Sequence, residues 1–180
     1  MVGRFQPFHN GHQALVKAAL EDCVEVAVGV GSSNAKPSLR NPFTFDERRE
    51  MVHAVFPQVQ VVPLPDIHDP LRWVDHVVTL LGRVDKVFGN DEASVGLFED
   101  AGIRVVRPGL VERDQFEAST IRMQMAEGDP AWRKAVPAAV SPLLDRFDAT
   151  KRLRLLEMTR LSSASTMSRG PMRLRGRSIF

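Results

Sequence analysis

The 180-residue chain has no tyrosine and a single cysteine, Cys23. One thiol cannot build a disulfide framework or a thiolate metal site, and it is typical of a protein kept in a reducing compartment. No apolar run approaches the ~20 residues that a helix needs to cross a bilayer, and the N-terminus does not resemble a signal peptide. The sequence therefore predicts a cytoplasmic protein with no membrane partner.

Charge is unevenly placed along the chain. Residues 151–180 hold eight of the 24 Lys and Arg residues and a single acid, Glu157, so residues 1–150 carry 16 basic and 21 acidic side chains. A basic end can bind phosphate polymers through counterion release. From Ser162 onward, however, the sequence is rich in Ser, Met and Arg and has no apolar period. We therefore expect a disordered, low-complexity tail over residues 157–180 and no nucleic-acid partner.

Apolar runs rich in β-branched residues alternate with stretches of helical periodicity. The runs that predict strands are 24–31, 59–64, 86–89 and 104–107. The stretches that predict helices are 11–22, 44–55, 71–81 and 91–100, and the chain after residue 118 is helical with breaks at its prolines. Near-continuous apolar strands are typical of a parallel sheet covered on both faces. The pattern predicts one α/β domain with a doubly wound parallel sheet over residues 1–156.

The first strand is expected to be very short, because only Met1 and Val2 precede a glycine-containing turn at Gly3. In a doubly wound sheet the first strand lies in the middle. Either the chain starts upstream of this methionine or the strand is truncated, and in both cases backbone hydrogen-bond partners will be missing from the centre of the sheet.

The densest group of chemically useful residues is Gly3-Arg-Phe-Gln-Pro-Phe-His-Asn-Gly-His12. A turn leads here into a helix for which Asn10 is the predicted cap, and Gly11 lets a ligand approach the backbone. The free N–H groups and positive dipole end of such a helix form an anion site, at which His9 and His12 can donate hydrogen bonds to phosphate. A metal site is a poorer interpretation because no third ligand lies in register.

This segment resembles the HxGH signature of the nucleotidyltransferase superfamily, in the form found in archaeal-type nicotinamide-nucleotide adenylyltransferases. The resemblance covers roughly residues 2–156. It continues through Gly31-Ser-Ser33, Asn41-Pro-Phe-Thr44, Glu47-Arg48, Pro65-Asp-Ile67, Trp73-Val74, Gly89-Asn90, Ile121-Arg122, Glu127-Gly128 and Val136-Pro137. The opening motif indicates the superfamily, and the joint set narrows it to this family.

The resemblance implies a Rossmann-like fold and a reaction that joins ATP to nicotinamide mononucleotide (NMN), giving NAD and pyrophosphate. It also implies that His9 and His12 contact ATP phosphates, that Arg122 holds the β- and γ-phosphates, and that Mg²⁺ arrives on ATP without a protein cage of its own. The implied ATP-binding residues are Gly3, Arg4, Phe5, Phe8, Gly11, Asn90, Ser119 and Thr120. The implied NMN-binding residues are Arg48, which meets a phosphate, Asp66, Ile67, and Trp73, which stacks on the nicotinamide. We further expect a homo-oligomer.

The sequence departs from the family pattern at two places. The family commonly has Ser-Gly-Thr-x-Ile-Arg where this chain has Glu117-Ala-Ser-Thr-Ile-Arg122, so a carboxylate lies where a triphosphate is expected. Pro70 replaces an Asn that usually precedes the tryptophan. Two alternatives therefore stay open. The acceptor could be nicotinate mononucleotide, flavin mononucleotide or a pantetheine phosphate, or the chain could be a nucleotide-binding protein without catalysis.

Overall fold

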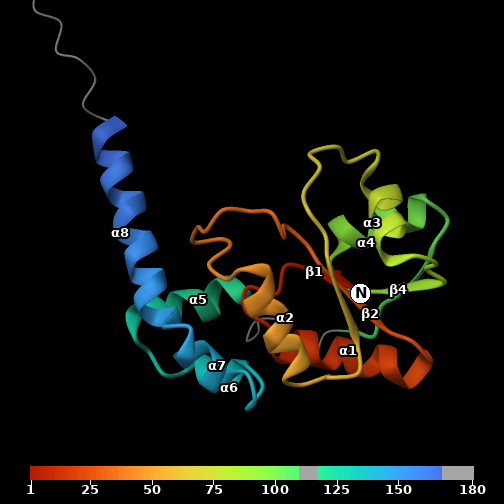
Figure 1. The fold of residues 1–180 in the computed structure, drawn as a ribbon, viewed down its shortest axis with the longest axis horizontal. Helices are drawn as coiled ribbons and strands as arrows, with labels where there is room; N and C mark the ends of the chain where they lie inside the picture. Colours follow the sequence, from red (N-terminus) through yellow and green to blue (C-terminus); the bar gives the residue numbers. More distant parts are fainter. Residues whose placement is uncertain (110–116, 168–180) are drawn as a thin grey trace, which may run out of the picture.

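Strands and helices alternate along the first part of the chain, as the hydrophobic pattern predicts (Figure 1). The structure is a computed structural model that describes residues 1–109 and 117–167. The alternating elements are β1 (Val2–Gly3), α1 (Asn10–Asp22), β2 (Ala27–Val30), α2 (Phe45–His53), β3 (Gln60–Pro63), α3 (Trp73–Leu81), β4 (Lys86–Phe88), α4 (Glu92–Asp100) and β5 (Arg104–Val106). From residue 117 the described chain is helical, with α5 (Ala118–Glu127), α6 (Trp132–Ala135), α7 (Ser141–Arg146) and α8 (Ala149–Met167).

The strands form a parallel sheet that is interrupted in its middle. β2 pairs with β1 and with β3, with Val2 opposite Gly29 and Val28 opposite Val61. β4 pairs only with β5 among the described strands, so the backbone pairing separates into β1-β2-β3 and β4-β5. β1 is two residues long and does not pair with β4 in the described residues. The predicted gap in the centre of the sheet is thus confirmed.

Helices cover both faces of the strands, as a doubly wound fold requires. On one face α1, α2 and the C-terminal helices enclose a core that includes Val16, Met51 and Ile121, each fully buried. On the other face α3 and α4 pack on β3 and β4 around Val77 and Phe98. The two cores hold β1 and β4 side by side at one level, and both strands end beneath the same opening.

Two predicted helix starts have different outcomes. Thr44 caps α2 as predicted, because its hydroxyl accepts from the Glu47 N–H at 3.3 Å while the Glu47 carboxylate accepts from the Thr44 N–H at 2.8 Å. The prediction that Asn10 caps α1 is wrong. His9 holds the cap position, and the Asn10 amide instead donates to the Lys134 carbonyl at 2.9 Å. An amide that has a partner in the C-terminal helices is not available for its own helix end.

α8 extends beyond the predicted end of the domain. The predicted boundary between residues 156 and 157 falls inside this helix, which leaves the body of the molecule and continues to Met167 (Figure 1). The first half of α8 is packed through Leu153, which is 1% exposed. Residues 168–180, the rest of the predicted tail, lie outside the described residues. In the described part of the chain, no helix is long and apolar enough to cross a membrane.

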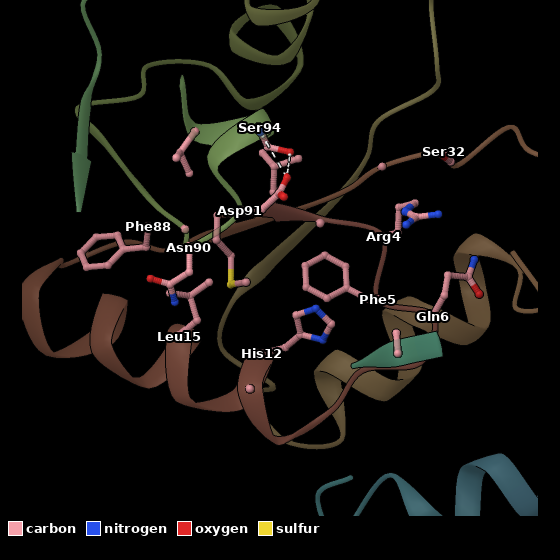
Figure 2. A pocket seen from close by; sticks show the side chains of 18 of the residues that line it. Arg4, Phe5, Gln6, His12, Leu15, Ser32, Phe88, Asn90, Asp91 and Ser94 are labelled. Atoms are coloured by element: carbon pink, nitrogen blue, oxygen red, sulfur yellow. Dashed lines mark hydrogen bonds between the residues drawn. The ribbon is translucent and has the colours of Figure 1, made fainter. Parts of the chain in front are cut away.

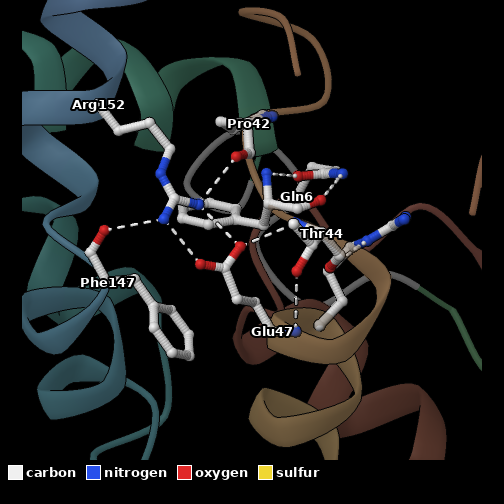
Figure 3. Close-up of polar contacts among 8 residues, drawn as sticks. Gln6, Pro42, Thr44, Glu47, Phe147 and Arg152 are labelled. Atoms are coloured by element: carbon white, nitrogen blue, oxygen red, sulfur yellow. Dashed lines mark hydrogen bonds and ion pairs between the residues drawn. The ribbon is translucent and has the colours of Figure 1, made fainter. Parts of the chain in front are cut away.

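Arg152 ties α8 to α2 through a nearly saturated guanidinium (Figure 3). Its two terminal nitrogens donate to both carboxylate oxygens of Glu47 at 2.7 Å, to the Pro42 carbonyl at 3.0 Å and to the Phe147 carbonyl at 3.1 Å. Burial raises the pKa of Glu47, but the hydrogen bonds from Arg152 and Thr44 outweigh it, so this pKa lies below its usual value of 4.5. The pair therefore stabilises the fold above about pH 4.5, and its contribution is lost as the pH falls through the lowered pKa.

We expect Arg152→Met to lower the free energy of unfolding by about 2 kcal/mol, because it leaves a half-buried carboxylate and two carbonyls without their donor. Urea denaturation at pH 7 measures this change. Arg146→Met is the matched control, since Arg146 pairs with Glu50 at the surface and its loss should cost no more than about 0.5 kcal/mol. Equal losses in the two variants would show that the Arg152 contacts do not stabilise the fold specifically.

Candidate active site

Most of the predicted site residues gather around one cavity of about 560 Å³ at the carboxyl ends of β1 and β4 (Figure 2). A volume of this size suits a small-molecule ligand. The predicted residues that line it are Gly3, Arg4, Phe5, His9, Gly11, His12, Asp66, Trp73, Asn90 and Arg122. Open parallel sheets bind their ligands beyond the carboxyl ends of the strands, so the position of this cavity agrees with its contents.

A larger cavity, of about 820 Å³, opens at the amino ends of β2 and β4. Its lining includes no histidine, and its charged residues are Asp22, Glu25, Arg83, Asp85 and Lys86. Lys86 is already paired with Asp22 at 2.5 Å, and Arg83 with Asp85 at 2.8 Å. Size favours this second cavity, but its chemistry does not: its strongest cations are neutralised by neighbours. The smaller cavity is therefore the candidate site.

The turn between β1 and α1 is built by Phe5 folding back over Gly3. A side chain at Gly3 would place its first carbon 2.9 Å from the Phe5 ring, so only glycine fits beneath that ring. Phe5 itself has a left-handed backbone, with φ of 52°, and its ring is 1% exposed. The glycine expected to shape this turn provides space, while the unusual dihedral falls on its aromatic neighbour.

His9 and His12 form a stacked pair at the first turn of α1. Their ring centroids lie 3.6 Å apart at 25°, and the edge of Phe5 packs on His12 with centroids 4.7 Å apart. The backbone N–H of His9 donates to His12 Nδ1 at 3.3 Å. Because Nδ1 accepts, the proton of the neutral ring is assigned to Nε2. Nε2–H of His12 is then a hydrogen-bond donor held in a fixed orientation beside the cavity, as Figure 2 shows for this ring.

Both imidazoles are neutral at physiological pH. Burial lowers the pKa of His9 to about 4, and burial together with the neighbouring His9 lowers the pKa of His12 well below its usual value. His9 Nδ1 is buried and has no hydrogen-bond partner among the described residues. A buried polar atom without a partner at the edge of a cavity is normally satisfied by a bound ligand or water.

Three arginines converge on the same cavity without a carboxylate partner. Arg4 and Arg122 line it, and Arg122 donates to the Gln6 carbonyl at 2.8 Å. Burial and repulsion from neighbouring arginines lower the pKa of both, with Arg40 acting on each of them. None of the three forms an ion pair with a described residue. Like charges held together in this way predict a polyanionic ligand.

Arg40 is a candidate that the sequence did not single out. It is exposed and immediately precedes the Asn41-Pro-Phe-Thr44 segment. Its interaction with Arg4 and Arg122 marks it as part of the cationic end of the cavity. The signal available in the sequence was a basic side chain in the loop that follows β2, at the sheet edge where ligands bind.

Arg48 lies behind the cavity wall and does not line it. Its side chain is 1% exposed and donates to four backbone carbonyls, those of Arg4, Gly31, Ser32 and Thr44, at 2.7–3.2 Å. These hydrogen bonds engage four of the five N–H groups of the guanidinium. The structure therefore shows Arg48 holding the strand ends, in a position from which it reaches no solvent.

The opposite wall comes from the segments before α3 and α4. Asn90 donates to the Gly109 carbonyl at 3.3 Å, and the Asp91 carboxylate caps α4 by accepting from the N–H of Ser94 at 3.2 Å. Trp73, the first residue of α3, is half-buried and packs edge-on against Phe98 with ring centroids 5.3 Å apart. It therefore belongs both to the hydrophobic core and to the cavity wall.

Four other predicted residues do not line the cavity. Phe8 is fully buried and supports His12 from behind, with ring centroids 5.7 Å apart. Ile67 follows Asp66 in the loop after β3, and Ser119 and Thr120 lie in the first turn of α5. The residues of that helix that do line the cavity are Glu117, Ala118 and Arg122. Glu117 is exposed, and its carboxylate accepts from the Ser119 hydroxyl at 3.3 Å.

Comparisons with known proteins agree with these features. A family model described as cytidylyltransferase-like matches residues 1–90. The chain is 36% identical over 157 residues to a nicotinamide-nucleotide adenylyltransferase of Methanolobus tindarius, covering 85% of this chain and 90% of the relative. It is 35% identical to the protein of the same name from Archaeoglobus fulgidus, covering 85% and 93%, and 33% identical to that of Thermococcus kodakarensis, covering 96% and 95%.

The fold also matches a crystal structure. A bifunctional NMN adenylyltransferase/ADP ribose pyrophosphatase from Francisella tularensis, complexed with AMP and a Mn ion, superposes with a TM-score of 0.71 at 20% identity. The match covers 97% of this chain and 56% of that protein. At this level of identity the likeness establishes the Rossmann-like fold that the sequence predicts.

Proposed function

Because the chain belongs to the nicotinamide-nucleotide adenylyltransferase family, an enzyme family of NAD biosynthesis, we propose that the cavity at the ends of β1 and β4 joins ATP to NMN. The products are NAD and pyrophosphate. One observation carries the proposal: two neutral imidazoles, a helix start and a cluster of unpaired arginines share a cavity with a tryptophan. This set suits a triphosphate beside an aromatic ring.

The reaction is an in-line displacement at the α-phosphorus of ATP. An oxygen of the NMN 5′-phosphate forms the new bond to phosphorus, while the bond from phosphorus to the bridging oxygen of the β-phosphate breaks. Pyrophosphate leaves with that electron pair. No enzyme nucleophile is needed, so the protein contributes position and electrostatic stabilisation. The Nε2–H of His12 and the first N–H groups of α1 donate to oxygens on which negative charge develops.

The arginines act on the leaving group. Arg4, Arg40 and Arg122 repel one another in the free protein, and a bound triphosphate relieves that repulsion. Arg122 is anchored by its bond to the Gln6 carbonyl, and the Gln6 side chain is itself fixed by two hydrogen bonds to the backbone of Phe43, both 2.9 Å long (Figure 3). The guanidinium therefore needs little reorganisation before it meets the β- and γ-phosphates.

The acceptor half of the site centres on Trp73. Its exposed face offers the nicotinamide ring a stacking surface, and the pyridinium charge adds a cation–π attraction. Asp66 lies at the same end, where the Asn34 side chain holds its backbone N–H at 2.9 Å and its carbonyl at 3.2 Å. Ile67 follows it directly and contributes apolar surface to the same loop. Together these residues form the proposed NMN end of the cavity.

Mg²⁺ would enter bound to ATP and neutralise its phosphates. In the described residues no three His, Cys, Asp or Glu side chains gather in a way that could hold a metal ion. The residues present therefore fit an ion held by phosphate oxygens and water, with Asp66 or Asp91 close enough to the cavity to accept from that water. The neighbour from Francisella tularensis was crystallised with a Mn ion.

The proposal is tested by incubating the purified chain with ATP, Mg²⁺ and one candidate acceptor at a time. The acceptors are NMN, nicotinate mononucleotide, flavin mononucleotide and pantetheine phosphate. We expect NMN to give NAD and pyrophosphate in equal amounts, with kcat/KM above that of the other acceptors. Preference for another acceptor would reassign the substrate, and the absence of product with any of them would leave a nucleotide-binding protein.

Glu117 is expected to weaken ATP binding, because its exposed carboxylate lies on the cavity wall at the start of α5. We expect Glu117→Gln to lower the KM for ATP about threefold at low salt, and less at high salt. Glu127→Gln, at the other end of the same helix, is the matched control and should leave that KM unchanged. An unchanged or higher KM in Glu117→Gln would mean that the carboxylate points away from the triphosphate or helps to bind it.

The predicted homo-oligomer and the cytoplasmic location stay predictions. α8 offers one candidate contact surface, since Leu155, Met158 and Leu161 are 54%, 64% and 56% exposed along one side of the helix. Light scattering of the purified protein measures the oligomeric state directly.

A further inference from the structure

Two residues beside the cavity have a backbone conformation that L-residues rarely adopt. Phe5 has a φ of 52° and Ser32 a φ of 50°. Phe5 follows β1 and Ser32 follows β2, so the two left-handed turns lie at neighbouring strand ends. Such conformations cost of order 1 kcal/mol each and persist only where the surrounding structure enforces them.

Arg48 contacts both of these turns. Its Nη1 donates to the Arg4 carbonyl at 2.9 Å and to the Gly31 carbonyl at 2.7 Å. These are the carbonyls of the peptide units that immediately precede Phe5 and Ser32. Nη2 donates to the Ser32 carbonyl at 3.2 Å, so the second turn is held on both sides of its strained residue.

The remaining contact fixes where the guanidinium lies. Nε donates to the Thr44 carbonyl at 3.1 Å, and Thr44 is the capped start of α2. The side chain is 1% exposed and forms no ion pair with a described residue. Burial lowers the pKa of Arg48 to about 10, which leaves it cationic at neutral pH. A buried cation with only carbonyl partners is unusual, because burial normally requires a carboxylate.

We propose that Arg48 is a positioning residue for ATP, which holds the two left-handed turns and thereby orients Arg4 and the Ser32 segment toward the triphosphate. This inference rests on the proposed function. Figure 2 shows Arg4 and Ser32 at the same end of the cavity. Carbonyl oxygens at the carboxyl ends of parallel strands would repel phosphates, and Arg48 engages three of them from behind.

The geometry distinguishes this role from direct phosphate binding. A direct contact would require Arg48 to leave several of its four carbonyls and to pass the Arg4–Phe5 turn. Released carbonyls would then be buried without a donor. Lysine cannot replace this arrangement, because a single ammonium has three donors on one atom and cannot span carbonyls from three segments.

The test compares Arg48→Lys with wild type in two backgrounds, the natural Ser32 and Ser32→Gly. Glycine accepts a positive φ without strain, so it removes part of the need for a clamp. We expect Arg48→Lys to raise the KM for ATP about tenfold with Ser32 present, and by clearly less when both proteins of the pair carry Ser32→Gly. The KM for NMN should change little. Arg49→Lys, the exposed neighbour, is the matched control and should behave as wild type.

Circular dichroism and thermal unfolding accompany each assay. An unchanged KM for ATP in Arg48→Lys, with or without a lower kcat from loss of folded protein, would overturn the proposal and leave Arg48 a structural residue. The same KM ratio in both backgrounds would overturn it as well. If Arg48→Lys folds only together with Ser32→Gly, the coupling is confirmed; if it folds in neither, the role is structural. Failure of wild type to make NAD would instead refute the proposed function.

Discussion

Replacing His12 by Ala should lower kcat by about 10²–10³-fold while changing the KM for ATP little. Loss of one preorganised donor to a developing oxyanion has a cost of this size. The donor is preorganised here because the His9 N–H fixes the tautomer, and because Phe5 and His9 pack on the ring. An imidazole that is neutral in the free enzyme also needs no deprotonation before ATP arrives. Steady-state kinetics with ATP and NMN varied separately measure both constants.

Two further variants separate chemistry from packing. His12→Gln keeps an amide donor near the position of Nε2 and should recover part of the lost rate. His53→Ala removes a histidine of α2 whose ring contacts only the Val59 carbonyl, and should leave kcat unchanged. If His12→Ala turns over at a near-normal rate, the imidazole supports the fold alone and the mechanism given for it is wrong.

Replacing Trp73 by Ala should raise the KM for NMN about tenfold and the KM for ATP by less than twofold. Loss of a stacking surface and of a cation–π contact accounts for a change of this size. The selectivity follows from geometry, because Trp73 lies on α3 while the imidazoles and arginines lie at the opposite wall. Saturation curves for each substrate measure the two effects. Trp73→Phe should retain most of the affinity for NMN.

Trp73 also packs on Phe98, so its loss will lower stability. Val77→Ala is the matched control, since Val77 is fully buried on the same helix and in the same core but does not line the cavity. It should lower the melting temperature and leave the KM for NMN unchanged. Equal changes in the KM for ATP and for NMN in Trp73→Ala would mean that this tryptophan supports the fold and does not bind the nicotinamide.

Local patterns in the sequence were sufficient for the fold and for half of the site. Strand and helix periodicity predicted the α/β alternation, because each element buries a face that its own residues define. The capping box at Thr44 and Glu47 was readable for the same reason. His9 and His12 are three residues apart at a helix start, so their meeting required no tertiary information.

Residues whose roles depend on distant segments were not predictable in this way. Arg48 and Arg49 are adjacent and chemically alike, but only Arg48 is buried, because its carbonyl partners come from residues 4, 31 and 32. Arg40 joins the cationic group through Arg4 and Arg122, which are far from it in sequence. α8 continues past residue 156 although its apolar period fades there, and periodicity was the signal used to place the domain boundary.

The most direct test of adenylyl transfer follows the fate of each phosphorus of ATP. The purified chain is mixed with NMN, Mg²⁺ and ATP labelled at either the α- or the γ-phosphate, and the products and the protein are separated after a single turnover. An in-line displacement at the α-phosphorus predicts that all α-label enters NAD, all γ-label enters pyrophosphate, and none remains on the protein. Recovery of α-label as free AMP or bound to the protein, or of γ-label in the dinucleotide, would contradict the account.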